Sequence, residues 1–155
     1  MSDEQAMGRA LAEAEAAVAH GDVPVGAVVM VDGELVAARH NERELSRDPT
    51  AHAELLALRD AAAAVGSWRL EGASLFATLE PCLMCAGALV VARLSRLVFG
   101  AADPKGGACG SLYNVCVDPR LNHELAGRGG VLSDDASQLI TEFFASRRGA
   151  ASPLV

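Results

Sequence analysis

Two short stretches of the sequence decide the fold: His52-Ala53-Glu54 and Pro81-Cys82-Leu83-Met84-Cys85. Thiols three positions apart share one face of a helical turn, so this pair can bind one ion together. One imidazole and two thiols form a ligand set that suits zinc. A structural zinc site is normally closed by a fourth protein ligand, whereas a catalytic site leaves that position to water. Three ligands with the Glu54 carboxylate beside them therefore indicate a catalytic zinc centre with its own general acid and base.

The segment between the two stretches predicts how they meet. Residues 51–65 are rich in Ala and Leu and stop at a glycine, which is typical of a helix. Residues 73–79 form an apolar run that predicts a buried strand, and a second helix is expected over residues 83–93. Helix–strand–helix units in an open sheet bring successive helix N-termini to one sheet edge, where ligands usually bind. We therefore expect His52 to meet Cys82 and its partner thiol in an α/β fold.

The start of the first of these helices is predicted at Asp48-Pro49-Thr50. Asp48 or Thr50 can cap the helix, and proline suits a first turn. On this prediction His52 and Glu54 both lie in the first helical turn. The partial positive charge of that helix end favours thiolates and other anions placed above it.

The N-terminal part of the chain predicts a helix followed by a hairpin. Residues 3–20 are rich in Ala and Glu, which is typical of an amphipathic helix. Its apolar residues at helical spacing are Leu11, Ala14, Ala17 and Val18. Two apolar runs, residues 23–31 and 34–38, flank Asp32-Gly33, which is a strong signal for two antiparallel strands. Residues 39–49 are polar and aperiodic, and we expect a loop there.

The C-terminal part predicts two strands, residues 95–101 and 131–132, separated by a polar, Gly-rich loop that begins at Asp103. A last helix is expected to start at Asp134 or Asp135, either of which can cap it, and to run to about residue 148. The tail from about residue 149 is expected to be frayed.

Composition and charge place the chain among ordinary folded domains. Its 155 residues carry no internal repeat or linker, so we expect a single domain over residues 1–155. Hydrophobic residues make up 51% and aromatic residues only 4%, so the core must consist mainly of Ala, Val and Leu. A formal net charge of −7 argues against broad nucleic-acid binding, and DNA is not an expected partner. A local basic patch, within one chain or assembled by a homodimer, remains compatible with this charge.

Cysteine usage and the N-terminus indicate where the protein works. A Cys-x-x-Cys spacing without an export signal is typical of metal binding or redox chemistry rather than of a disulfide framework. The N-terminus is acidic and lacks a signal-peptide pattern, and no apolar run reaches membrane-spanning length. We therefore expect a soluble, cytoplasmic protein that does not interact with membranes.

Other residues could bind metal, and we weigh them against simpler roles. A redox Cys-x-x-Cys beside an unrelated histidine is the alternative to zinc, but it leaves Glu54 without a role. His20 and His40 are better explained as surface or hydrogen-bonded histidines. Cys109 and Cys116 have no histidine at ligand spacing, which favours buried small residues over a second metal pair.

The motifs resemble those of the cytidine deaminase superfamily, and more closely those of its bacterial tRNA-specific adenosine deaminases. The zinc motifs alone indicate the superfamily, whereas the Asp-Pro-Lys-Gly-Gly loop, the Asn-His pair and the Phe-Phe and Arg-Arg pairs narrow it to the tRNA enzymes. The segments that carry the resemblance are 24–28, Asn41, 48–54, 78–88, 98–101, 103–107, 110–112, 122–123, 143–144 and 147–148.

This resemblance implies a three-layer α/β/α sandwich with a five-stranded mixed sheet, in a homodimer whose active sites lie near the interface. It implies hydrolytic deamination of adenosine to inosine at the wobble position of a tRNA anticodon, mainly of an arginine tRNA. One zinc per subunit would be bound by His52, Cys82 and Cys85, and Glu54 would shuttle protons. Asn41 and the backbone around Ala53 would contact the base.

The resemblance also implies contacts to the anticodon loop. The candidates are Asp103, Lys105, Asn122, Phe144 and Arg147. Without it, Phe143-Phe144 would be taken as core packing and Arg147-Arg148 as a solvated helix end. An anticodon loop suits this chemistry because its bases are already unstacked, so that extruding one costs little free energy.

Two rival functions remain open at this point. A free-base or nucleoside deaminase of the same superfamily, acting on guanine or cytosine, would have the same zinc centre but would close its pocket with its C-terminal segment. A zinc-stabilised scaffold, or the silent partner of a heterodimer, would be expected to lack the carboxylate that Glu54 supplies.

Overall fold

The structure, a computed structural model, describes residues 1–149. The tail that was expected to be frayed lies almost wholly outside the described residues. The helices are α1 (Asp3–Ala17), α2 (Ala53–Val65), α3 (Leu83–Val91) and α4 (Ser133–Gly149), with short 3-10 turns η1 (Val18–His20) and η2 (Val115–Val117). The strands are β1 (Gly26–Val31), β2 (Glu34–His40), β3 (Ala73–Leu79), β4 (Arg96–Ala101) and β5 (Ala126–Arg128).

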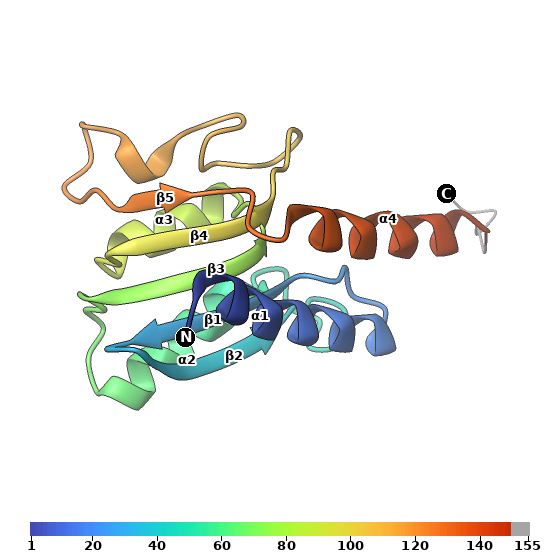
Figure 1. Ribbon diagram of the computed structural model, residues 1–155, viewed down its shortest axis with the longest axis horizontal. Coiled ribbons are helices and arrows are strands. Elements are labelled where there is room, and N and C mark those ends of the chain that lie inside the picture. Colours follow the sequence, from blue (N-terminus) through green and yellow to red (C-terminus); the bar gives the residue numbers. More distant parts are fainter. Residues whose placement is uncertain (150–155) are drawn as a thin grey trace.

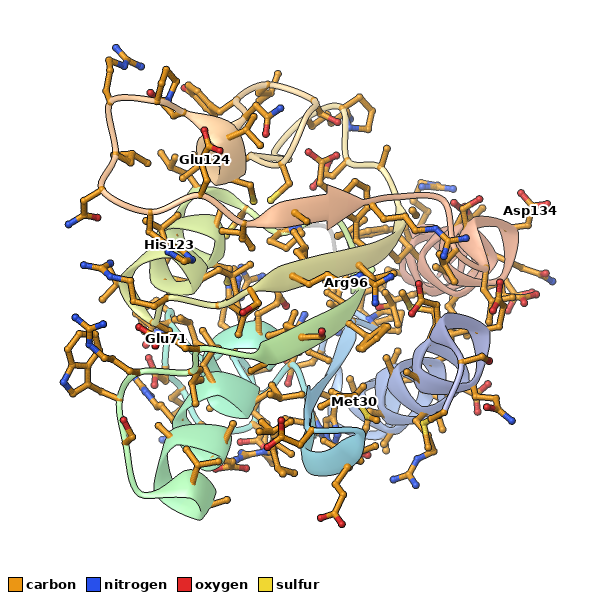
Figure 2. All side chains as sticks on the ribbon, turned by 60° about the vertical axis from the view of Figure 1, so that its left-hand side comes forward. Met30, Glu71, Arg96, His123, Glu124 and Asp134 are labelled. Carbon is orange, nitrogen blue, oxygen red and sulfur yellow. The ribbon has the colours of Figure 1, made fainter. Side chains whose placement is uncertain are left out.

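The strands form one five-stranded sheet in the order β2-β1-β3-β4-β5. β1 runs antiparallel to β2 and β3, whereas β3, β4 and β5 are parallel. Helices α1 and α4 cover one face of the sheet and α2 and α3 cover the other (Figures 1 and 2). This arrangement confirms the expected three-layer α/β/α sandwich with a mixed sheet.

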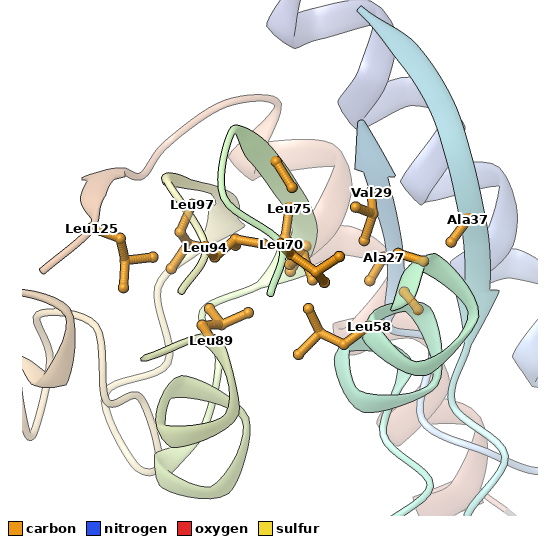
Figure 3. Packing of buried hydrophobic residues seen from close by; sticks show 14 of the residues in the cluster. Ala27, Val29, Ala37, Leu58, Leu70, Leu75, Leu89, Leu94, Leu97 and Leu125 are labelled. Carbon is orange, nitrogen blue, oxygen red and sulfur yellow. The ribbon is translucent and has the colours of Figure 1, made fainter. Parts of the chain in front are cut away.

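The core has two parts, one on each face of the sheet. Side chains alternate between the faces along a strand, so Leu75 of β3 packs towards α2 and α3 while Phe76 packs towards α1. Figure 3 shows the larger part, where Leu58 of α2 and Leu89 of α3 meet the strands. Almost all of its members are Ala, Val and Leu, as the composition predicted. Each fully buried Leu or Val contributes about 1.5–3 kcal/mol.

The prediction of a short strand at residues 131–132 is wrong. The fifth strand is β5, whose backbone pairs in parallel with Arg96, Leu97 and Val98 although its side chains are exposed. An exposed three-residue edge strand carries no hydrophobic pattern, because its position depends on the strand beside it and not on burial. Val131 is instead buried in the core part on the α1 side.

The apolar face predicted for α1 is only partly right. Val18 is 47% exposed, and the residues that face the sheet are Ala6, Met7, Ala10, Ala14 and Ala17. Small side chains face inwards because α1 lies directly on β1. A Cβ atom added at Gly26 would lie 1.9 Å from the carbonyl oxygen of Ala10.

Three further boundaries differ from the sequence prediction. Asp134 and Asp135 lie in the first turn of α4 and not at its cap. β1 begins at Gly26, after Pro24, and β2 continues to His40 in the segment expected as a loop. None of the helices within residues 1–149 is long and apolar enough to cross a membrane.

The contact between Gly26 and α1 leads to a test of stability. Gly26→Ala should lower the free energy of unfolding by about 3 kcal/mol, because the new methyl group overlaps helix backbone that cannot move alone. Gly8→Ala, on an open face of α1, should instead stabilise the protein by up to about 1 kcal/mol. Urea unfolding measures both, and equal midpoints for Gly26→Ala and the wild type would contradict the close packing.

Candidate active site

The site is built where two helices begin. His52 is the N-cap residue of α2, in extended conformation with φ −80° and ψ 147°. Cys82 holds the same position in α3, with φ −73° and ψ 175°. Neither side chain caps its own helix, so both are free to face each other. The predicted start of α2 at residue 51 is wrong, because Asp48 and Thr50 form a separate hydrogen-bonded turn before the helix.

The three predicted ligands lie together. His52 Nδ1 is 3.6 Å from Cys82 Sγ and 3.5 Å from Cys85 Sγ, and the three donor atoms lie within 4.8 Å of one another. Around a tetrahedral zinc ion, nitrogen and sulfur ligands are separated by about 3.6 Å. Within residues 1–149 no fourth His, Cys, Asp or Glu joins this group. The donor set therefore fits one zinc ion with a position left for water.

The electrostatics of the group favour anionic sulfur. The hydrogen bond from the Cys85 thiol lowers the pKa of Cys82 to about 3, although burial acts in the opposite direction. The hydrogen bond to Cys82 raises the pKa of His52. The N-termini of α2 and α3 both point at this place and add partial positive charge. A thiolate here is therefore ready to bind a cation.

Glu54 lies beside the ligands and is almost completely buried, with 4% of its surface exposed. Burial raises the pKa of this carboxyl group, while the nearby His52 acts to lower it. A buried carboxyl group that is not part of the ligand set can both accept and release a proton close to the metal.

The metal group opens into a pocket of about 170 Å³. Its lining residues are Asp22, Val23, Val25, Asn41, Arg43, His52, Glu54, Leu79, Glu80, Cys82 and Asp103. Asn41 bridges two of the segments around this pocket. Its amide nitrogen donates to the carbonyl oxygen of Val23 at 3.0 Å, and its amide oxygen accepts the N–H of Ala53 at 2.9 Å. Asn41 thus satisfies the first N–H of α2.

Three charged residues of this pocket were missed by sequence reasoning: Asp22, Arg43 and Glu80. The buried Asp22 carboxylate accepts the backbone N–H groups of Glu44 and Leu45 and so holds the loop that carries Arg43. The sequence did contain a signal for two of these residues. Asp22 precedes β1 and Glu80 follows β3, so each acidic residue lies next to an apolar segment. Charges in such places are rarely buried without a specific set of partners.

A groove of about 770 Å³ adjoins the pocket and shares Val23, Leu79 and Asp103 with it. Its other lining residues are Ala101, Ala102, Pro104, Lys105, Ser137, Ile140, Thr141, Phe144 and Arg148. Three of the predicted RNA contacts, Asp103, Lys105 and Phe144, therefore lie in one groove. Lys105 is the only lysine of the chain.

The other two predicted contacts lie elsewhere. Arg147 donates to the carbonyl oxygen of Gly21 and lies over the Phe143 ring, 4.8 Å from its centre, so it is Arg148 that lines the groove. Asn122 is exposed and next to His123, which bonds the Leu94 carbonyl before β4 begins, at 2.6 Å. Figure 2 shows His123 on the side of the molecule away from Asp134 and α4.

The remaining histidines and cysteines take no part in the metal group. His20 and His40 stack with ring centres 5.2 Å apart and contact Asp22 and Glu13. Cys109 and Cys116 are free thiols whose sulfur atoms are 3.6 Å apart. The histidines and the buried Cys116 agree with the simpler roles expected from the sequence, whereas Cys109 is only half-buried.

A family model for MafB19-like deaminases matches residues 1–148. The chain belongs to this family. Among curated members, the tRNA-specific adenosine deaminase of Bacillus subtilis (strain 168) is 47% identical over 146 residues, which cover 94% of this chain and 91% of that protein. The family resemblance seen in the sequence is thereby confirmed.

Solved structures of other deaminases agree with this placement. A structure from a study of A-to-I editing by tRNA:A34 deaminases superimposes with a TM-score of 0.84 at 41% identity, covering 87% of this chain and 98% of that one. A guanine deaminase from Nitrosomonas europaea follows with a TM-score of 0.79 at 27% identity, covering 93% of this chain and 85% of that one. The fold is thus shared by enzymes that are named for different substrates.

The ligand group leads to a test of metal binding. Cys85→Ser should weaken zinc binding more than about 100-fold. Loss of a residue that only orients a metal ligand typically costs about 10–100-fold in affinity, and this variant removes one of the three ligands themselves. Cys109→Ser should bind zinc like the wild type, since this thiol lies outside the ligand group. Competition with a chromophoric chelator measures both affinities, and equal losses in the two variants would contradict the assignment.

Proposed function

We propose that this protein is a zinc-dependent deaminase that converts adenosine to inosine at the wobble position, position 34, of a tRNA anticodon. The observation that carries the proposal is the continuity of the metal pocket with an open groove that contains Lys105, Phe144 and Arg148. The similarity to tRNA-specific adenosine deaminases supports the same substrate. An arginine tRNA is the proposed acceptor, on the family resemblance alone.

In this proposal the protein supplies the proton transfers. His52, Cys82 and Cys85 would hold a zinc ion, which would supply an activated water for attack on the C6 atom of adenine. Glu54 would take one proton from that water and deliver it to the ring nitrogen beside C6. As the new C6 hydroxyl becomes a carbonyl, Glu54 would take the proton of that hydroxyl and pass it to the amino group, which leaves as ammonia. Its burial keeps bulk water away from the proton it carries.

Asn41 is proposed to orient the base. One hydrogen of its amide is used by the Val23 carbonyl, and the second is available for an acceptor nitrogen of the purine. The Ala53 N–H is already bonded to Asn41. We therefore assign Ala53 the role of holding Asn41 in place.

The groove suits a single-stranded RNA loop. Phe144 is 43% exposed and offers a face on which an unstacked base can lie. Lys105 and Arg148 in the groove, with Arg43 in the pocket, supply cations for phosphates although the chain as a whole is acidic. Asn122 and Arg147 are not part of this proposal, because neither faces the groove.

A free-base deaminase is the second candidate, favoured by the structural similarity to a guanine deaminase and by the acidic charge. Such an enzyme would be expected to close its pocket with its C-terminal segment. Within residues 1–149, α4 lines the groove but contributes no residue to the metal pocket. A single deamination assay separates the two candidates.

The assay offers zinc-loaded protein an arginine tRNA anticodon stem-loop, free adenosine, cytidine and guanine. We expect inosine at the wobble position and no ammonia from the small molecules. Glu54→Gln should lower kcat by about 10²–10⁴-fold without loss of zinc, because the amide cannot carry a proton. Ammonia from guanine alone would establish the second candidate, and no product from any substrate would favour a non-catalytic scaffold.

We also propose that the protein forms a homodimer through an apolar surface on α2 and α3. This surface consists of Leu55, Leu58, Arg59, Ala62, Trp68, Leu70, Ala88, Val91 and Ala92. Trp68 and Val91 are 59% and 66% exposed, which is unusual for neighbouring large apolar residues on a monomer. Leu83 and Met84, also exposed, extend apolar character along α3 towards the metal ligands, which supports active sites near the interface.

Val91→Asp should convert the dimer into a monomer, because dimer formation would bury the new carboxylate without a partner. Light scattering after gel filtration measures the mass of each species. Val18→Asp, at an exposed valine outside this surface, should leave the dimer intact. A Val91→Asp variant with unchanged mass would place the interface elsewhere.

Finally, we propose that the chain acts as one domain in the cytoplasm. Both parts of the core rest on the same sheet, which supports one cooperative unit. Thiol ligands bind zinc only when reduced, and the cytoplasm keeps them so.

A further inference from the structure

Glu80 is a buried acidic residue whose hydrogen-bond partners are all neutral groups within residues 1–149. It follows the last residue of β3, precedes Pro81-Cys82, and is 2% exposed. Among the ion pairs of residues 1–149 it takes no part. A buried carboxylate is costly unless hydrogen bonds replace its lost hydration. The partners of Glu80 therefore need an explanation.

All of these partners come from one segment, the loop over residues 103–111. The carboxylate accepts the backbone N–H groups of Asp103, Cys109 and Ser111, each at 3.0 Å, and also the Ser111 hydroxyl. Oxygen Oε1 serves Asp103 and the hydroxyl, while Oε2 serves the other two amides. One side chain thus holds both ends of the loop.

The middle of the loop is shaped to the same carboxylate. A Cβ atom at Gly107 would lie 2.3 Å from the Glu80 carboxyl carbon, so only glycine allows this approach. Gly107 also pairs with Cys82 in an isolated β-bridge. The N–H of the next residue, Ala108, donates to the Pro81 carbonyl oxygen at 2.9 Å. The loop is therefore wrapped around Glu80 and joined to the segment that carries a metal ligand.

We propose that Glu80 is a positioning residue that fixes the 103–111 loop and thereby places Lys105 and Asp103 beside the metal pocket. The inference deepens the proposed function, on which it rests for the identity of the substrate. Charge-assisted hydrogen bonds to four donors hold the loop in one conformation. The loop thus holds Lys105, the only lysine of the chain, in a fixed position relative to Cys82. No direct bond between the lysine and the segment that carries this metal ligand is needed.

Glu80→Gln tests this role. The glutamine amide replaces one acceptor oxygen of the carboxylate with an NH2 donor, and this donor would face N–H groups of the loop. We expect KM for the anticodon stem-loop to rise about tenfold, with kcat changed less than about threefold and zinc retained. Lys105→Ala should raise KM about tenfold in the wild type but less than about threefold in Glu80→Gln, since the lysine is no longer held in place.

Thr78→Val serves as the matched control. Thr78 is buried two residues earlier and accepts the Gly26 N–H at 3.1 Å, so its loss disturbs the same strand but not the loop. In this background Lys105→Ala should keep its full effect on KM. Ser111→Ala, which removes one donor and leaves the carboxylate buried, replaces Glu80→Gln in the cycle if that variant does not fold.

Hydrogen–deuterium exchange gives a readout that does not depend on the substrate. Amides of residues 103–111 should exchange faster in Glu80→Gln than in the wild type, and should be unchanged in Thr78→Val. Unchanged exchange in the loop, or an equal effect of Lys105→Ala in every background, would overturn the role of Glu80. A loosened loop in a protein that is inactive on the stem-loop would leave that role intact and overturn the proposed function instead.

Discussion

Three donor atoms, one from α2 and two from α3, must lie within 4.8 Å of one another, and this requirement organises the molecule. It can be met because β3 connects the two helices and returns the chain to the same edge of the sheet. Both helices then begin at the metal group, each with a ligand at its N-cap. The partial positive charge of the two helix ends reinforces the arrangement by stabilising thiolates. Neither N-cap side chain makes a capping hydrogen bond to its own helix, and Asn41 satisfies the first N–H of α2 from another loop.

Three buried acidic residues surround the pocket, and their surroundings give them different properties. Burial dominates at Glu54 and raises its pKa, which suits a group that must take up and release a proton. Hydrogen bonds outweigh burial and lower the pKa of the other two carboxyl groups. At Glu80 they come from the Ser111 hydroxyl and from backbone N–H groups, and at Asp22 from backbone N–H groups and His20. These two carboxylates stay ionised and hold loops in place. Carboxyl groups around one pocket thus acquire opposite pKa shifts, according to whether burial or hydrogen-bond donors dominate their surroundings.

The surface divides in a similar way. The chain has a net charge of −7, yet the groove beside the pocket contains Lys105 and Arg148, with Arg43 inside the pocket. Many other arginines are paired with carboxylates, as Arg96 and Arg128 are with Asp3. Lys105, Arg148 and Arg43 thus give this place positive charges within an acidic chain, which supports binding of one loop over broad binding of nucleic acid.

Much of this protein follows from local sequence pattern. The metal ligands and Glu54 could be predicted because residue type and spacing are sufficient to specify their chemistry, and β3 could be predicted to the residue from its apolar run. The hairpin at Asp32-Gly33 follows from turn chemistry alone. These features depend on neighbours within a few positions along the chain.

Other features were decided only by the tertiary structure. β5 exists because β4 offers it a free edge, and the small residues of α1 face inwards because β1 approaches closely at Gly26. Asp22 and Glu80 became anchors through partners more than 20 positions away in the sequence. Arg147 is likewise placed by its contact with Gly21, and Asn122 by its neighbour His123, which contacts the segment before β4. Such assignments escape sequence reasoning because burial and hydrogen bonding between distant segments have no local period, whereas ligand spacing and strand alternation do.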